Sequence, residues 1–149
     1  MQNNKRNKQA GFTLLEVMVV IVILGIMASM VVPNLMGAAG QAKTQKAVSD
    51  IGQMEQILDQ YKLDNNRYPT TEQGLDALVN EPSVDPEPRR YRQGGYMKRI
   101  EQDPWGYDYQ YVSPGENGDF DLYSLGADGE EGGEGENADI GNWNIDEFK

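Results

Sequence analysis

Three residues near the start of the chain, Gly11, Phe12 and Glu16, have the types and spacing for a proteolytic cut followed by a charge pairing. Glu16 is the one charged residue in the otherwise apolar stretch 12–32. A carboxylate inside such a segment is costly in a membrane and marks a functional site. It follows Phe12 by four residues, about one helical turn. If the Gly11–Phe12 bond is cut, the new α-amino group can pair with Glu16 of a neighbouring subunit, which offsets the desolvation of both charges.

A second candidate site is the acidic, glycine-rich stretch 125–143. Six carboxylates lie between residues 128 and 139, in a spacing that does not match an EF-hand. Dense carboxylates and flexible glycines nevertheless suit calcium, which takes hard oxygen ligands. Composition alone favours a disordered acidic tail. Ile140 and Trp143 instead favour a loop that returns to the core, and a closed loop with these charges repels itself unless a cation neutralises it.

The composition excludes most other chemistry. The 149 residues contain no cysteine and no histidine, which removes disulfides, the usual general base and the commonest transition-metal ligand. A zinc site or a Ser/His/Asp triad is therefore excluded. The net charge of −11, with eleven acids and no base between residues 116 and 147, is the opposite of a nucleic-acid footprint. We expect neither catalytic activity nor nucleic acid as a partner.

Two segments must position Phe12 and Glu16: a leader at residues 1–11 and an apolar helix at residues 12–33. The leader has no acid and three basic residues, Lys5, Arg6 and Lys8. A helix of about 20 residues spans the roughly 30 Å of a bilayer core. The basic flank predicts a cytoplasmic leader and an exported remainder. An ordinary secretory signal is too short to fit this run, and a plain signal anchor leaves Glu16 unexplained.

The rest of the chain reads as one long helix that continues into a small head. An amphipathic pattern over 34–63 predicts that the helix resumes after Pro33 and packs on the head, residues 64–149. Thr70 and Gln73 fit a capping box that starts a short second helix. Alternating tyrosines and apolar residues predict an antiparallel hairpin of strands 107–112 and 120–125. The tyrosines at 107, 109 and 111 are expected to pack over the long helix, and Trp105 to pin the core or a loop.

The string Gly11-Phe12-Thr13-Leu14-Leu15-Glu16, after a basic leader and before a long apolar run, resembles the signature of type IV pilins and pseudopilins. The resemblance implies cleavage after Gly11 by a prepilin peptidase, N-methylation of Phe12 and a need for Glu16 in assembly. It also implies an α+β, type IV pilin-like fold, with a long N-terminal helix packed on a small head that has a short helix, a small antiparallel sheet and a C-terminal calcium loop.

The head resembles the major pseudopilins of type II secretion systems over most of its length. The similar segments are 61–65, Tyr68-Pro69, Glu72-Gln73-Gly74-Leu75, Asp103-Pro104-Trp105-Gly106 and 125–143. In that family a calcium ion sits in the last of these. The resemblance implies Asp128 and Asp139 as side-chain ligands and the Leu125 carbonyl as a backbone ligand, with Glu136 as a further candidate.

The function implied by the resemblance is structural. The chain is expected to be a self-assembling subunit that polymerises into a pseudopilus and drives protein secretion across the outer membrane. The implied partners are copies of itself, minor pseudopilins, the prepilin peptidase and the inner-membrane assembly platform. The implied location is a single-pass position in the bacterial inner membrane with the head in the periplasm. The alternative is a type IV pilin for adhesion, motility or DNA uptake, although such pilins usually close their C-terminal loop with a disulfide. A membrane-anchored enzyme is a third possibility, weakened by the missing cysteine and histidine.

Overall fold

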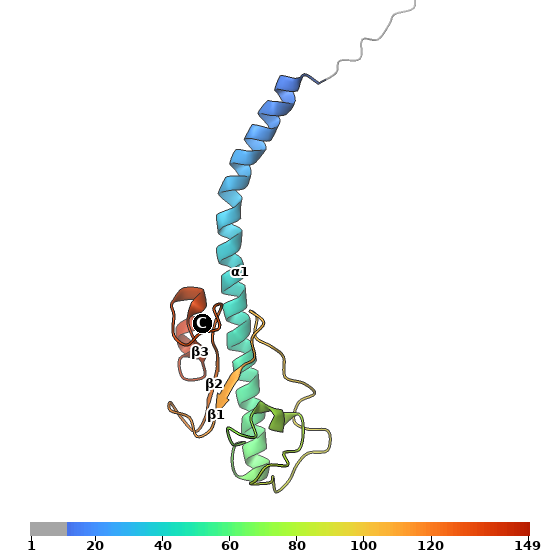
Figure 1. Cartoon of the computed structure of the whole chain (residues 1–149), viewed down its shortest axis with the longest axis vertical. Helices are drawn as coiled ribbons and strands as arrows, with labels where there is room; N and C mark the ends of the chain where they lie inside the picture. The colour runs from blue at the N-terminus through green and yellow to red at the C-terminus, as the bar shows by residue number, and fades with distance from the viewer. Residues whose placement is uncertain (1–11) are drawn as a thin grey trace, which may run out of the picture. The chain divides into compact units, whose positions relative to one another are not determined.

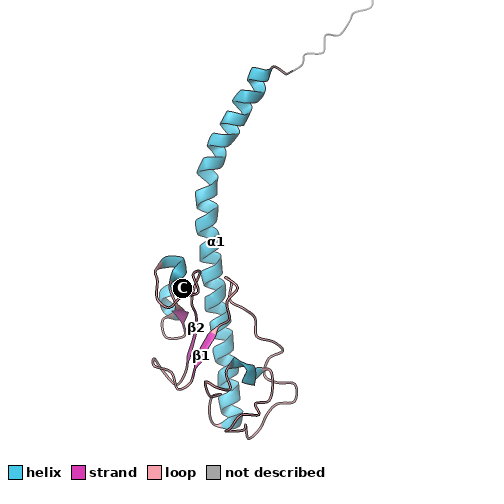
Figure 2. Cartoon of the chain, in the orientation of Figure 1, coloured by secondary structure: helices cyan, strands magenta, loops and turns pink. Residues whose placement is uncertain are grey.

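The computed structural model describes residues 12–149, without the side chains of residues 31–36. Its first element is α1 (Leu14–Asn65), a helix of 52 residues (Figures 1 and 2). The prediction that the helix resumes after Pro33 is confirmed, because α1 continues through that residue without a break. The contacts divide the chain into two units, which meet between Ala38 and Ala39. The predicted leader, residues 1–11, lies outside the described residues.

The first unit, residues 12–38 as described, consists of the first part of α1 and the two residues before it. Each side chain from Phe12 to Met30 is exposed, among them Phe12 at 84% and Leu24 at 59%. Among the helices of the described residues, none has the length and apolar character needed to cross a membrane.

The second unit, residues 39–149, forms a core against the later turns of α1. The buried residues Ala47, Ile51, Met54, Leu58 and Tyr61 recur at steps of three and four, so they lie on one helical face. Leu122 and Ile140 from the sheet and Leu78 from a short turn pack in the same cluster. The predicted amphipathic helix is therefore confirmed where it meets the head.

The sheet has three short antiparallel strands in the order β1 (Gln110–Val112), β2 (Asp121–Ser124) and β3 (Ile140–Gly141). Tyr111 pairs with Leu122 in the predicted hairpin, which is confirmed, and Ser124 pairs with Ile140. Figure 2 shows that the strands of this hairpin run beside α1. The sequence did not indicate β3, because two residues are too few to show an alternating pattern.

Strand β1 is shorter than predicted because Tyr107 belongs to a turn. Its backbone nitrogen donates to Asp103 Oδ1 at 2.8 Å, and its carbonyl accepts from Asp103 N at 2.8 Å. Tyr109 and Tyr111 are buried in the core as expected. The same prediction was wrong for Tyr107, which is 41% exposed. Trp105 packs partly buried against the core, as predicted.

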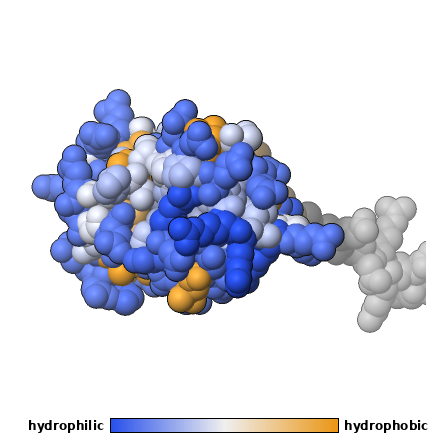
Figure 3. Space-filling model, turned by 90° about the horizontal axis from the view of Figure 1, so that it is seen from below, coloured by the Kyte–Doolittle hydropathy of each residue, from blue (hydrophilic) through white to orange (hydrophobic). Residues whose placement is uncertain are grey.

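The second helix expected after Thr70 is replaced by a turn and a single 3-10 turn, Leu75–Leu78. The capping box itself is present, since Gln73 N donates to Thr70 Oγ1 at 3.2 Å and Thr70 N donates to Gln73 Oε1 at 3.1 Å. Gly74 then adopts φ +59°, a left-handed conformation that stops an α-helix from continuing. The face of the head shown in Figure 3 is mostly hydrophilic, with small separate apolar areas.

Candidate assembly helix and cation-binding loop

The first candidate site is the start of α1, where Thr13 caps the helix that carries Glu16. Glu16 N donates to Thr13 Oγ1 at 3.2 Å and to the Thr13 carbonyl at 3.1 Å. Sequence reasoning missed this role of Thr13, although the spacing Thr-x-x-Glu is itself a capping signature. The side chains of Phe12 and Glu16 are exposed. Gly11, the other half of the predicted cleavage site, lies outside the described residues.

The apolar surface that follows Glu16 has no partner within the described chain. Residues 12–30 are exposed, and eight of the ten residues from Val17 to Ile26 are valine, leucine or isoleucine. A contiguous apolar surface of this kind marks contact with lipid or with other protein chains. This part of the helix is therefore expected to contact lipid or other protein chains.

The second candidate site is the loop between β2 and β3, which the structure closes at its neck. Ala127 N donates to the Glu136 carbonyl at 2.8 Å. At Gly126, where φ is +69°, a Cβ atom would lie 2.8 Å from both Asn137 C and the Glu136 carbonyl oxygen, so the two arms of the loop cross in backbone contact. Ile140 is 1% exposed in β3, whereas Trp143, the second residue behind the prediction, is 40% exposed and contacts Tyr123. The prediction of a loop that returns to the core is confirmed, and a free acidic tail is excluded.

Asp139 carries the strongest sign of a ligand position. Its Oδ2 accepts from Gly132 N at 2.9 Å, whereas its Oδ1 is buried and has no hydrogen-bond partner in the described structure. Asn144 Nδ2 donates to the Asp139 carbonyl at 3.1 Å, a contact that sequence reasoning missed and that no simple pattern indicates. A buried carboxylate oxygen without a donor is costly unless a cation binds it.

The other predicted ligands are placed differently. Asp128 is exposed, and its Oδ1 accepts from Glu130 N at 3.1 Å. Leu125, whose carbonyl is the predicted backbone ligand, directly follows β2. Glu136 turns its carboxylate toward Gly40 of α1, where a Cβ atom would collide with it. Over the residues that the structure describes, no three acidic side chains already converge as a metal-binding group.

The donors of the loop nevertheless fit calcium. Carboxylates and backbone carbonyls are the hard oxygen ligands that calcium prefers, and its coordination shell accepts several backbone oxygens. The Oδ1 of Asp139 is buried and unpartnered in the described structure, and Gly126 lets the backbones of the two arms approach closely. The residues present are therefore compatible with the ion that the resemblance implies.

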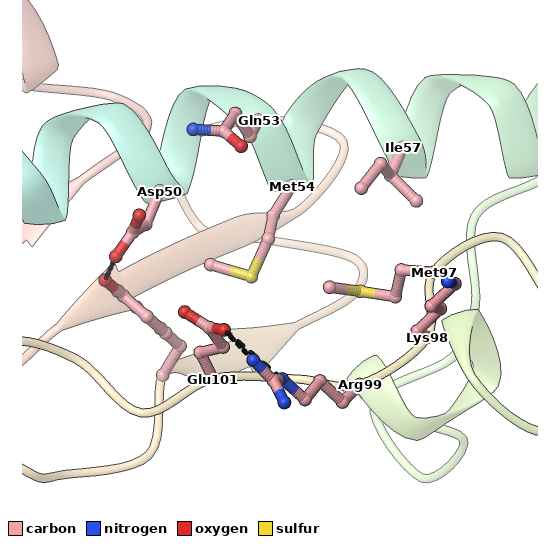
Figure 4. A pocket seen from close by; sticks show the side chains of 9 residues that line it. Asp50, Gln53, Met54, Ile57, Met97, Lys98, Arg99 and Glu101 are labelled. Atoms are coloured by element: carbon pink, nitrogen blue, oxygen red, sulfur yellow. Dashed lines mark hydrogen bonds and ion pairs between the residues drawn. The ribbon is translucent and has the colours of Figure 1, made fainter.

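A separate pocket of about 280 Å³ lies between α1 and the segment 97–101 (Figure 4). Met54, Ile57 and Met97 form its apolar part, and Arg99 pairs with Glu101 at 2.9 Å on its rim. Tyr109 donates to Asp50 at 3.0 Å, and burial, aided by the Asp50 charge, raises the pKa of this tyrosine far above its usual range. A tyrosine whose pKa is raised in this way stays neutral and acts as a hydrogen-bond donor to Asp50.

Both candidate sites lie within regions that match known protein families. Residues 34–143 match the profile of the family described as "Type II secretion system (T2SS), protein G", and residues 6–32 match the prokaryotic N-terminal methylation motif. The chain belongs to the type II secretion system protein G family. The first match contains the whole loop between β2 and β3, and the second contains Phe12 and Glu16.

Individual members of the type II secretion system protein G family are similar over nearly the entire chain. The type II secretion system core protein G of Vibrio cholerae is 66% identical over 97% of this chain and 99% of its own length. The core protein G of Aeromonas hydrophila is 65% identical over the same shares. A crystal structure of the major pseudopilin of enterohaemorrhagic Escherichia coli matches with a TM-score of 0.66 and 58% identity, over 74% of this chain and 95% of that one. The predicted α+β, pilin-like fold is confirmed.

Proposed function

We propose that this protein is the major pseudopilin of a type II secretion system, a structural subunit that polymerises into the pseudopilus. One observation carries the proposal: a protein G head, matched over residues 34–143, is joined to an assembly signal, matched over residues 6–32. The exposed apolar surface of residues 12–30 supports it, because polymerisation would cover this surface with the same segment of other copies. The protein contributes assembly and not catalysis.

Maturation begins at the Gly11–Phe12 bond. A prepilin peptidase cuts it, and the new N-terminus of Phe12 is methylated. Thr13 holds the first turn of α1 in place, so that the Glu16 carboxylate stands about one turn along the helix from this amine. In the apolar interior of a filament, Glu16 of one subunit pairs with the Phe12 amine of the next and fixes their axial register.

Before assembly the subunit is stored in the inner membrane. The apolar residues 12–32 cross the bilayer once, the basic leader stays in the cytoplasm, and the head lies in the periplasm. There it meets the prepilin peptidase, the assembly platform and the minor pseudopilins. Growth of the homopolymer then pushes secreted proteins toward the outer membrane.

A calcium ion completes the head. Asp139, through its unpartnered Oδ1, Asp128 and the Leu125 carbonyl are the proposed ligands, and Glu136 remains a further candidate. When bound, the ion supplies positive charge that offsets the repulsion between the carboxylates of the loop. The chain's own part is to bring both arms together at Gly126 and to hold Asp139 with Gly132 N.

The proposal is tested by expressing the full chain together with the other components of a secretion system. Mass spectrometry of the mature protein is expected to show loss of residues 1–11 and one added methyl group. Glu16→Ala is expected to abolish filaments and secretion, while Glu81→Ala, which removes an exposed acid of the head, leaves both unchanged. An intact Met1 in the mature protein, or normal filaments from Glu16→Ala, would contradict the proposal.

A further inference from the structure

The turn at residues 103–107 is anchored by a buried carboxylate that does more than hold the turn. Asp103 is 4% exposed. Its Oδ1 accepts from Trp105 N at 3.0 Å and from Tyr107 N at 2.8 Å. These two backbone donors fix the carboxylate and leave its second oxygen, Oδ2, facing the end of β2.

That second oxygen holds Ser124. Ser124 Oγ donates to Asp103 Oδ2 at 2.5 Å, and the serine is fully buried. A hydroxyl has one hydrogen to donate and two lone pairs with which to accept. Because the hydrogen is committed to Asp103, a lone pair is available for Gly126 N, which donates to Ser124 Oγ at 3.2 Å. The Asp103 charge strengthens the first of these bonds, since hydrogen bonds to ionised acceptors are the stronger kind.

The bond to Gly126 N also sets the direction of a carbonyl. The Leu125 C=O and the Gly126 N–H belong to the same peptide unit, which is planar and trans, so the two groups point in opposite directions. When Ser124 holds the N–H, the Leu125 carbonyl is turned the other way and cannot rotate without breaking that bond. Leu125 supplies the proposed backbone ligand for calcium.

The same turn contacts the loop again on the other side of Asp128. The ring of Tyr107 lies on Gly129, where a Cβ atom would be 2.7 Å from Tyr107 Cζ. Gly129 has φ +70°, so its conformation also favours glycine. The turn therefore fixes residues 126 and 129, and Asp128 lies between these two fixed points.

We propose that Asp103 and Ser124 are positioning residues for the calcium site, acting on the Leu125 carbonyl through the Gly126 peptide, with Tyr107 as a second brace. The inference rests on the calcium-binding part of the proposed function. It assigns to the Asp103 turn a role in ion affinity and not only in folding. Partners of metal ligands that act at one remove typically change metal affinity by about 10- to 100-fold when they are removed.

The test is calcium titration of the full chain in detergent, by calorimetry, at a temperature where every variant is folded. Ser124→Ala removes both bonds of the hydroxyl and is expected to weaken calcium binding by about 10-fold or more. Asp103→Asn keeps an oxygen for the Trp105 and Tyr107 amides but offers Ser124 a donor in place of an acceptor, so a smaller loss is expected. The matched control is Asp121→Asn. Asp121 is also a buried carboxylate and lies in β2; it accepts hydrogen bonds from Glu116 and Asn117 and, in the described structure, none from residues 125–139.

The control separates a positioning role from a structural one. All three variants are expected to lower the melting temperature in chelator, but Asp121→Asn is expected to change the dissociation constant less than about twofold. The inference is overturned if Asp121→Asn and Ser124→Ala change the calcium dissociation constant equally. It is also overturned if neither Ser124→Ala nor Asp103→Asn changes that constant, and in both cases the calcium site itself stands. If Ser124→Ala fails to fold, Asp103→Asn alone decides by the same criterion. A wild-type chain that binds no calcium would refute the calcium site, and the inference with it.

Discussion

Two glycines of α1 offer a sharp test of how the acidic loop contacts the helix. A Cβ atom at Gly52 would have no neighbour within 4 Å, whereas a Cβ at Gly40 would collide with the Glu136 carboxylate. Gly→Ala inside a helix stabilises by about 0.5–1 kcal/mol where space allows. Gly52→Ala is therefore expected to stabilise the head by that amount, which for a domain near 100 residues corresponds to a rise in melting temperature of a few degrees.

Gly40→Ala is expected to lose most or all of this gain. The Glu136 carboxylate is the flexible end of a long side chain, so it can move aside. The move costs its packing on α1 and a change of side-chain rotamer. The loss of a few van der Waals contacts and of a preferred rotamer is of the order of 1 kcal/mol. The expected net change for Gly40→Ala is thus close to zero, about 1 kcal/mol below that for Gly52→Ala.

Thermal unfolding of the full chain in detergent, monitored by circular dichroism, measures both variants. Glu136→Ala completes the cycle, because without the carboxylate Gly40→Ala should regain the stabilisation seen at Gly52. The reasoning is refuted if Gly40→Ala stabilises as much as Gly52→Ala in the wild-type background. It is also refuted if Glu136→Ala leaves the effect of Gly40→Ala unchanged.

Two further predictions concern solution conditions. Burial raises the pKa of Tyr96 to about 12 and those of Tyr109 and Tyr111 further still. Each tyrosine therefore contributes stability that is fully present below the usual tyrosine pKa and is lost as pH rises through the folded-state pKa. The urea midpoint of unfolding should fall above about pH 10, and less steeply for Tyr109→Phe, whereas a flat profile from pH 9 to 12 would contradict this. Removal of calcium with a chelator should lower the melting temperature by several degrees, because a ligand at 100 times its dissociation constant adds about 2.7 kcal/mol, and an unchanged melting temperature would exclude the ion.

Periodic and local features of the fold could be predicted from the sequence. The stripe from Ala47 to Tyr61 has helical spacing and is the buried face of α1. The Thr70–Gln73 capping box also formed as expected, because its bonds join residues three apart. What followed it was not predictable in the same way, since the left-handed Gly74 outweighed the apolar pattern of the next residues.

Contacts between distant segments could not be predicted. Asp103 and Ser124 are 21 residues apart and join a turn to a strand end, a pairing that no spacing rule gives. Tyr107 continues the alternation of Tyr109 and Tyr111, yet the Asp103 turn takes it out of the strand. For the loop, residue types indicated calcium, but only the structure shows that Asp139 keeps a buried oxygen unpaired while Glu136 faces α1.

The proposed calcium site offers a role for the acidic loop in a protein that has no cysteine. Beyond the β2–β3 pairing at its base, the neck is crossed in the described structure by one backbone bond, from Ala127 N to the Glu136 carbonyl. A disulfide closing a loop of about 15 residues would add roughly 3 kcal/mol. Calcium at 100 times its dissociation constant adds nearly as much, about 2.7 kcal/mol. The ion can therefore replace a covalent closure in magnitude, but its contribution depends on its concentration. If calcium binds as proposed, the stability of the head rises with the calcium concentration.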